Sequence, residues 1–195
     1  MRHSHKVITA DRKGDGEEKV LRTSVKPLDS TDSDEILRVL RDDGGYAMRV
    51  NGEQADSRTV ASLLSDKPPE VGADDHHVMG LWVDDELAGV ASFVVGWPSP
   101  DITYLGLLQL RTSHQGRGLA RAFHHALRAE FPGRWRLTVV DTNAAVLPFW
   151  ERLGYARTGE TKEWASDSGL RHEALVMELP ASRERPAPFH PLPTS

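Results

Sequence analysis

The segment that most constrains the fold is a glycine-rich turn between an apolar run and a helix-like run. Residues 102–110 are mostly apolar, residues 115–120 read Gln-Gly-Arg-Gly-Leu-Ala, and residues 119–130 carry apolar side chains at helical spacing. Glycine accepts the left-handed backbone of a tight turn. The N–H groups of a first helical turn lack partners, and the helix dipole favours negative charge there. The pattern predicts a strand-turn-helix unit whose turn binds a diphosphate, with an ordinary tight turn as the alternative.

Arginines are concentrated around this turn. Residues 111–136 contain six arginines and a single acidic residue, Glu130, whereas the whole chain has a net charge of -5. The cluster predicts an electropositive neighbourhood for a polyanionic cofactor, and a solvated helix face is the other interpretation. The negative total charge argues against nucleic acid as the main partner.

Composition excludes several classes of site. The chain has no cysteine, which excludes disulfides, cysteine-based zinc sites and a cysteine nucleophile, and which fits a cytoplasmic location. Residues 1–19 lack the apolar region of a secretory signal. No apolar run approaches the ~20 residues of a membrane span, so we expect no membrane partner.

The pattern along the chain predicts one domain with two tails. Residues 1–19 are polar and expected to be disordered, residues 20–180 form the domain, and residues 181–195 form a proline-rich tail. Strands are predicted at residues 20–25, 78–83, 87–95, 102–110 and 135–140, with two closing strands around Trp164 and Leu175. Helices are predicted at residues 32–41, 58–64, 119–130 and 143–153, the last starting late or bending because of Pro148. This order predicts an α/β (α+β) fold with helices on both sides of one sheet.

Two elements in this order resemble those of the GNAT superfamily of N-acetyltransferases. Residues 115–120 match its Q/R-x-x-G-x-G/A element, and Leu108 to Arg111 lie where its central strand meets the acyl group. Asn143 with residues 149–155, Phe-Trp-Glu-Arg-Leu-Gly-Tyr, resembles its late element. The resemblance covers about residues 20–180. It implies a single GNAT-like domain with a mixed, mostly antiparallel central sheet, flanking helices and splayed central strands.

The resemblance also implies a co-substrate and the residues that hold it. The co-substrate is acetyl-CoA or another acyl-CoA, with no metal. The pyrophosphate would be held by the main chain of Gln115, Gly116, Arg117, Gly118, Leu119 and Ala120. The main chain of Leu108 and Leu110 would pair with the pantetheine arm, and the Leu110 N–H would polarise the thioester carbonyl. Asn143 would contact the cofactor, and a helix cap is the alternative for this residue.

The chain departs from the family pattern at two catalytic positions. Trp150 stands where many members carry a tyrosine acid, and an indole N–H is not a useful acid. Tyr104 stands where some members carry a glutamate base, and a phenol is a poor base near neutral pH. Neither role is therefore carried over, although Tyr104 remains the candidate for a polar residue facing the reaction centre. Tyr155 matches a buried closing aromatic of the family.

The acceptor side is less distinctive. Residues 74–77, Asp-Asp-His-His, would edge the acceptor cleft or form a solvated loop. Tyr46, Trp97 and Trp164 would line an acceptor pocket or serve as partly buried structure. Neighbouring side chains diverge on a strand or helix, so neither His76–His77 nor His124–His125 is predicted to bind a metal.

The function that the resemblance implies is transfer of an acyl group from acyl-CoA to an amine by direct attack. The acceptor would be a small-molecule amine or a protein amine, and a homodimer is a family-level expectation. One alternative is an acyl-CoA-binding regulatory module without turnover, motivated by the replaced tyrosine and glutamate. Another is a GNAT-fold transferase with a different donor, such as aminoacyl-tRNA, motivated by the arginine cluster.

Overall fold

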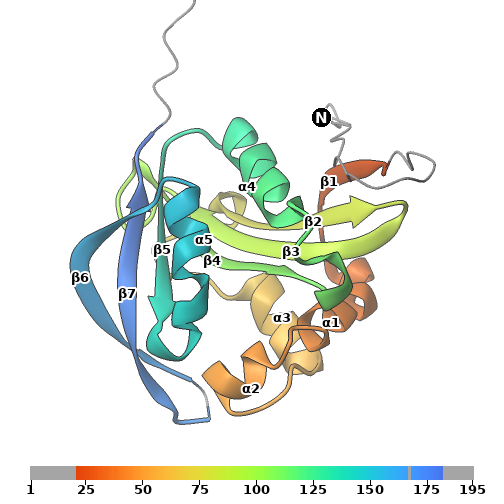
Figure 1. Cartoon of the computed structure of the whole chain (residues 1–195), viewed down its shortest axis with the longest axis horizontal. Helices are drawn as coiled ribbons and strands as arrows, with labels where there is room; N and C mark the ends of the chain where they lie inside the picture. Colours follow the sequence, from red (N-terminus) through yellow and green to blue (C-terminus); the bar gives the residue numbers. More distant parts are fainter. Residues whose placement is uncertain (1–20, 167, 182–195) are drawn as a thin grey trace, which may run out of the picture.

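The computed structural model describes residues 21–166 and 168–181 and contains one seven-stranded sheet (Figure 1). The strands are β1 (Thr23–Pro27), β2 (His76–Val83), β3 (Glu86–Val95), β4 (Ile102–Leu110), β5 (Arg134–Val140), β6 (Ala156–Ala165) and β7 (Arg171–Leu179). Their order in the sheet is β1-β2-β3-β4-β5-β7-β6. Only the β4–β5 pairing among them is parallel. The predicted mixed, mostly antiparallel sheet is therefore confirmed.

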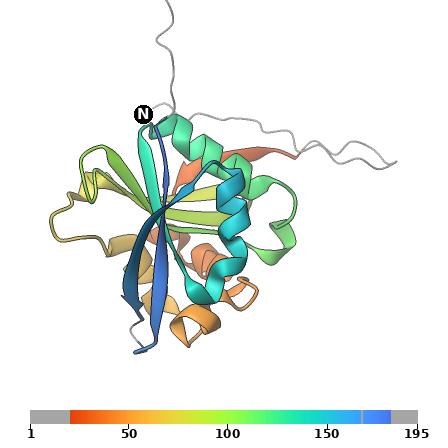
Figure 2. The same cartoon turned by 60° about the vertical axis from the view of Figure 1, so that its left-hand side comes forward.

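Helices cover both faces of the sheet, as Figures 1 and 2 show. The α-helices are α1 (Ser33–Arg41), α2 (Tyr46–Asn51), α3 (Ser57–Ser65), α4 (Leu119–Glu130) and α5 (Leu147–Arg152). Helices α4 and α5 bury Phe123, Leu127 and Trp150 in the larger apolar core. Helices α1 and α3 bury Ile36 and Val60 in a second core on the opposite face. Each amphipathic helix thus hides its apolar side against one face of the sheet.

Strand β4 separates from β5 partway along its length. The register between them runs only from Ile102 to Leu105, opposite Arg134 to Leu137, although both strands continue beyond this point. Strand β3 pairs with β4 up to Leu110, the last residue of β4, and Gly106 is an extra residue between the pairs Phe93–Leu105 and Ser92–Leu107. This bulge coincides with the separation of β4 from β5. The predicted splaying of the central strands is therefore present.

One helix differs from the sequence-based prediction, and another starts late as predicted. Helix α2 was not predicted, because Gly44 and Gly45 were interpreted only as the end of α1. The α-helix predicted at residues 143–153 begins only at Leu147, after a 3-10 segment, η4 (Asp141–Val146). Pro148 lies in the first turn of α5, where its missing N–H costs no helical hydrogen bond.

The predicted domain boundaries stay predictions. Residues 1–19 and nearly all of the predicted tail, residues 182–195, lie outside the described residues. Within the described part of the chain, no helix is both long and apolar enough to span a bilayer. The same residues contain no group of three or more histidine, aspartate or glutamate side chains placed to hold a metal ion.

Candidate active site

The glycine turn lies between the end of β4 and the start of α4. Gly116 and Gly118 have φ angles of 69° and 77°, in the left-handed region that favours glycine. A Cβ added at either residue would have no heavy atom within 4 Å, so open space surrounds the turn. The first hydrogen bond of α4 joins the Ala122 N–H to the Gly118 carbonyl at 3.0 Å. The N–H groups of the residues between them have no acceptor within the helix.

Side chains fasten this turn to the sheet and to α1. Gln115 Nε2 donates to the Leu110 carbonyl at 3.0 Å. Arg111 contacts the carboxylates of Asp42 and Glu86. The Thr112 hydroxyl donates to Asp42, and this hydrogen bond holds the pKa of the Asp42 carboxyl below its ordinary value. The turn is therefore anchored from both sides while its main chain stays open.

The free edge of β4 presents main-chain groups of alternate residues. The Arg111 N–H donates to the Ala88 carbonyl of β3 at 2.9 Å. Because main-chain groups alternate along an antiparallel strand, those of Gln109 also face β3, while those of Leu108 and Leu110 face the opposite edge. The hydrogen bond from Gln115 to the Leu110 carbonyl agrees with this direction. The two residues predicted to pair with a ligand therefore face the gap between β4 and β5.

Tyr104 lies in the part of β4 that still pairs with β5. Its hydroxyl is 3.0 Å from Thr138 Oγ1, and its ring packs edge-on against Trp97 with the centroids 4.9 Å apart. Burial raises the pKa of the phenol above its ordinary value. Tyr104 can therefore offer a hydrogen bond, but near neutral pH its phenolate, the form that could act as a base, is even scarcer than in a free tyrosine.

The late aromatic residues are buried on the α4 side. Trp150 and Tyr155 pack edge-on with their ring centroids 5.3 Å apart. The Tyr155 hydroxyl is 2.9 Å from Nε2 of His124, a buried residue of α4. Burial lowers the pKa of His124 to about 3, so the imidazole is neutral. Sequence analysis did not identify this pair, because histidine on a helix gives no signal of its partner.

Asn143 does not cap α5. It lies inside η4 with a non-helical backbone, φ -116° and ψ 21°, and the residue before α5 is Val146. Its side chain is half-buried on the segment that follows β5, the strand on the other side of the gap. The helix-cap alternative therefore does not hold for α5, and contact between Asn143 and the cofactor stays a prediction.

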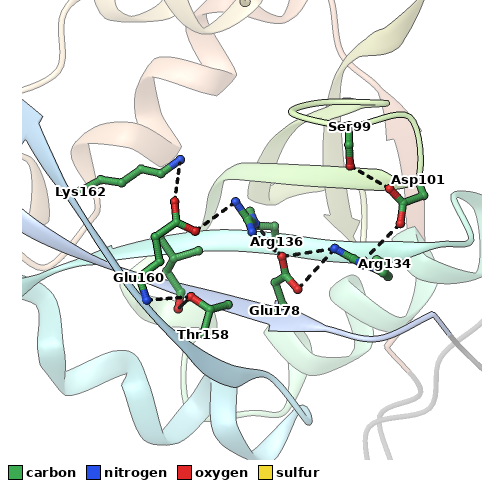
Figure 3. A network of polar contacts seen from close by, with 9 residues as sticks. Ser99, Asp101, Arg134, Arg136, Thr158, Glu160, Lys162 and Glu178 are labelled. Atoms are coloured by element: carbon green, nitrogen blue, oxygen red, sulfur yellow. Dashed lines mark hydrogen bonds and ion pairs between the residues drawn. The ribbon is translucent and has the colours of Figure 1, made fainter.

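Acidic residues neutralise part of the arginine cluster. Arg136 lies between Glu178 and Glu160, with nitrogen–oxygen distances of 2.6 and 3.4 Å, and Arg134 lies 3.5 Å from Asp101 (Figure 3). Arg111 is also paired with acids, as described above. The electropositive neighbourhood is consequently smaller than the sequence predicted, with Arg117 exposed in the turn itself.

A cavity of about 350 Å³ lies on the sheet face opposite α4. Helices α1, α2 and α3 supply its apolar walls, including Leu40, Ala47 and Leu63, and strands β3 and β4 supply Ser92 and Gly106. Of the three aromatic residues proposed for an acceptor pocket, Tyr46 lines this cavity. Trp97 instead contacts Tyr104, and Trp164 packs against His172.

The two histidines of the Asp-Asp-His-His segment point to opposite faces of β2. His76 Nε2 lies 3.3 Å from the Ser92 hydroxyl, on the cavity side. The His77 ring stacks on Phe93 with the centroids 5.2 Å apart, in the core beneath α4. Burial lowers the pKa of both imidazoles. Only the first histidine is thus placed near the cavity.

Comparisons with known proteins agree with this geometry. The sequence profile of the Acetyltransferase (GNAT) family matches residues 40–155. An acetyltransferase from Thermus thermophilus is similar in structure, with a TM-score of 0.63, 21% identity and coverage of 81% of this chain and 96% of that chain. The ribosomal-protein-S18-alanine N-acetyltransferase from Escherichia coli has a TM-score of 0.59 and 20% identity, with coverage of 86% and 99%. A search of curated protein sequences gave no match.

Proposed function

Because the chain belongs to the GNAT acetyltransferase family, we propose that it transfers an acetyl or related acyl group from acyl-CoA to an amine. The observation that carries the proposal is the separation of β4 from β5 beyond Leu105, directly before the glycine turn. An extended ligand arm can take the place of the missing strand, while its phosphates meet the start of α4.

The main chain would bind and orient the co-substrate. The Leu108 and Leu110 groups would pair with the pantetheine arm, and the N–H groups from Gln115 to Ala120 would hold the pyrophosphate. Bound acyl-CoA supplies an activated thioester. The Leu110 N–H would donate to the thioester carbonyl as negative charge develops there, which is worth a few kcal/mol for a preorganised donor.

The reaction asks little further of the protein. A neutral amine attacks the thioester directly, so the enzyme must position the reactants and accept a proton. A thiol with a pKa of ~8.5 can leave without a dedicated acid. We propose Tyr104 as a hydrogen-bonding residue near the reaction centre and not as a base, since burial raises its pKa.

Membership of the family does not define which amine is the acceptor. The name of the similar Escherichia coli structure gives an alanine of a ribosomal protein as its acceptor. A protein N-terminus and a small-molecule amine are both consistent with direct attack by an amine.

Binding of the co-substrate is tested by Gly118→Asp, which places a carboxylate in the open turn. We expect CoA affinity, measured by calorimetry, to fall by at least ~100-fold, or about 2.7 kcal/mol. Gly159→Asp is the matched control, because Gly159 has a φ of 84° and similar open space on β6. Unchanged CoA affinity in a folded Gly118→Asp variant would falsify the placement of the pyrophosphate.

Turnover is tested by measuring CoA release from acetyl-CoA with a panel of amines. Release that depends on the amine supports acyl transfer. Tight acetyl-CoA binding without release for any amine would instead identify a regulatory binding module. Activity that requires RNA would point to a different donor.

A further inference from the structure

The cavity and the proposed acyl site share one stretch of β4. Gly106 and Leu107 line the cavity, and they belong to the part of β4 that has left β5. Leu108, whose main chain faces the gap, is the next residue along the strand. The cavity and the proposed acyl site therefore border the same stretch of β4, with the cavity on the face opposite α4.

The cavity lining is mainly apolar. Leu40, Ala47, Ala55, Leu63 and Leu107 supply hydrocarbon surface. Among the described residues that line it, Asp66 alone carries a formal charge. The Gln109 amide is already committed to the Val39 carbonyl, to which it donates at 2.7 Å. A ligand with several charges would find few partners here, whereas an apolar body would be desolvated favourably.

The volume limits the size of the ligand. About 350 Å³ is near the lower end of the range for small-molecule pockets. A compact molecule can occupy it, but an extended peptide would have to remain largely outside. Helices α1, α2 and α3 and strands β3 and β4 line the cavity, which is open to solvent.

The polar end of the cavity can receive a proton from an amino group. Ser92 Oγ lies at this end, and His76 Nε2 is 3.3 Å away from it. Asp66 and Lys67 are the charged groups that act on His76, with opposite effects on its pKa, and the Lys67 ammonium donates to the Val71 carbonyl. Burial is the dominant effect and favours the neutral imidazole, which can accept a proton.

We propose that the acceptor is a small primary amine with an uncharged, apolar body, which occupies this cavity with its amino group directed to the gap beside β4, and that Ser92 and His76 receive its proton. This inference rests on the proposed acyl transfer. The nitrogen forms a bond to the thioester carbon, and the carbon–sulfur bond breaks with its electron pair on sulfur. Ser92 pairs with Leu107, about 10 Å along the strand from Leu110, so the proton lost by nitrogen passes through water and Ser92 to His76 Nε2. The thiolate takes a proton from solvent.

The substrate class is tested by comparing three acceptors in the CoA-release assay. They are phenethylamine, spermidine and a hexapeptide with an N-terminal alanine. We expect kcat/KM for phenethylamine to exceed that of either other acceptor by at least ~10-fold, since charged or extended bodies lose desolvation energy here. Equal or faster release with spermidine or the peptide overturns the inference but leaves acyl transfer intact. No release with any amine overturns acyl transfer itself.

The location is tested by a charge in the cavity wall. Leu63→Glu should raise the KM for phenethylamine by at least ~10-fold without changing the Kd for acetyl-CoA. Leu64→Glu is the matched control, because Leu64 is equally half-buried in the same helix and core but does not line the cavity. The milder Leu63→Gln should change KM in the same direction if the glutamate variant does not fold. Equal effects of Leu63 and Leu64 variants would show that the acceptor lies elsewhere.

The proposed role of His76 and Ser92 in receiving the proton is tested by the pH dependence of kcat/KM. In the wild type, protonation of His76 should produce a loss of activity at acidic pH, and His76→Gln and Ser92→Ala should lower activity and remove that ionisation. A purely structural role would lower activity equally at all pH values. His77→Gln is the control, because His77 has a similarly lowered pKa but stacks on Phe93 in the opposite core. A profile that is unchanged in His76→Gln contradicts this role.

Discussion

The two faces of the sheet reach the same segment of β4, but they contribute different kinds of groups. On the α4 side, the candidate cofactor site is made mainly of main-chain N–H groups from one continuous stretch, Leu108 to Ala120. On the α1–α3 side, the candidate acceptor site is made of side chains from α1, α2, α3, β3 and β4. A main-chain site depends on local backbone geometry, so a short motif can encode it. A side-chain cavity depends on packing between distant segments, so the same fold can present different acceptor sites.

The largest expected effect comes from removing a single main-chain donor on the cofactor side. Leu110→Pro deletes the N–H that faces the gap, and this group does not belong to the ladder with β3. We expect kcat/KM to fall by roughly 100- to 1,000-fold, as for loss of a preorganised donor at an oxyanion. Leu110→Met keeps the N–H and should cost less than about 1.5 kcal/mol of stability with near-normal turnover. Similar losses in both variants would mean that the side chain, and not the main chain, matters here.

The second prediction concerns the buried polar pair on the α4 side. His124 has a pKa of about 3 in the folded protein and regains its ordinary value of 6.5 on unfolding. Between these values the unfolded chain binds a proton that the folded chain does not. The free energy of unfolding should therefore fall as pH is lowered below 6.5, by about 1.4 kcal/mol per pH unit.

This slope can be isolated by urea denaturation of paired variants. The double variant His124→Phe, Tyr155→Phe removes both polar partners and should lose this part of the pH dependence. Tyr155→Phe alone keeps the histidine and should retain it. Parallel stability curves for wild type and double variant would contradict a neutral, buried His124.

A smaller effect is expected from the side chain that ties the turn to β4. Gln115→Ala removes the hydrogen bond to the Leu110 carbonyl, worth about 1 kcal/mol. CoA affinity should fall by roughly 5-fold, with its dependence on salt unchanged. Arg117→Gln, which removes a charge from the same turn, should reduce the salt dependence instead. If Gln115→Ala binds CoA normally, the turn is held by its backbone alone.

The smallest expected effect is at Tyr104. Tyr104→Phe removes the hydrogen bond to Thr138 but keeps the ring against Trp97. We expect a decrease in kcat of about 3-fold for a residue that only hydrogen-bonds near the reaction centre. Thr138→Val removes the Tyr104–Thr138 hydrogen bond but keeps the Tyr104 hydroxyl, so it separates the effect of the bond from that of the hydroxyl itself. A decrease of ~100-fold or more for Tyr104→Phe would place essential side-chain chemistry on this part of β4.

The sequence was most informative where structure is local. The apolar run of β4, the glycines and the apolar spacing of α4 predicted a continuous strand-turn-helix unit, and the structure contains it. Helix α2 was missed because the two glycines before it were interpreted as the end of α1, and because part of its support comes from a distant contact. His172 Nε2 lies 2.9 Å from the Val50 carbonyl, 122 positions away in the sequence. Asp43 also accepts hydrogen bonds from the Gly45 and Ala47 N–H groups, which stabilises the start of α2 after the glycines.

The difference between local structure and contacts between distant segments also explains which site residues could be predicted. Gln115 to Ala120 were identified because the roles proposed for them belong to the main chain. Ser92 was not identified, because nothing near it in the sequence reveals that it meets His76 on the neighbouring strand. The burial of His124 beside Tyr155 was missed for the same reason. Such pairs follow from the register of strands and the packing of helices, which periodicity alone does not determine.

The extra residue at Gly106 changes which residues of β4 direct their main-chain N–H and C=O groups to each edge of the strand. The main-chain groups that point to the β5 edge belong to Thr103 and Leu105 before the bulge, and to Leu108 and Leu110 after it. The interval across the bulge is therefore three residues, while the intervals on either side are two. A chain without residue 106 would keep its pairing with β3 in register and still offer a different spacing to the gap. One inserted residue therefore determines where along β4 a ligand arm can begin to form main-chain hydrogen bonds.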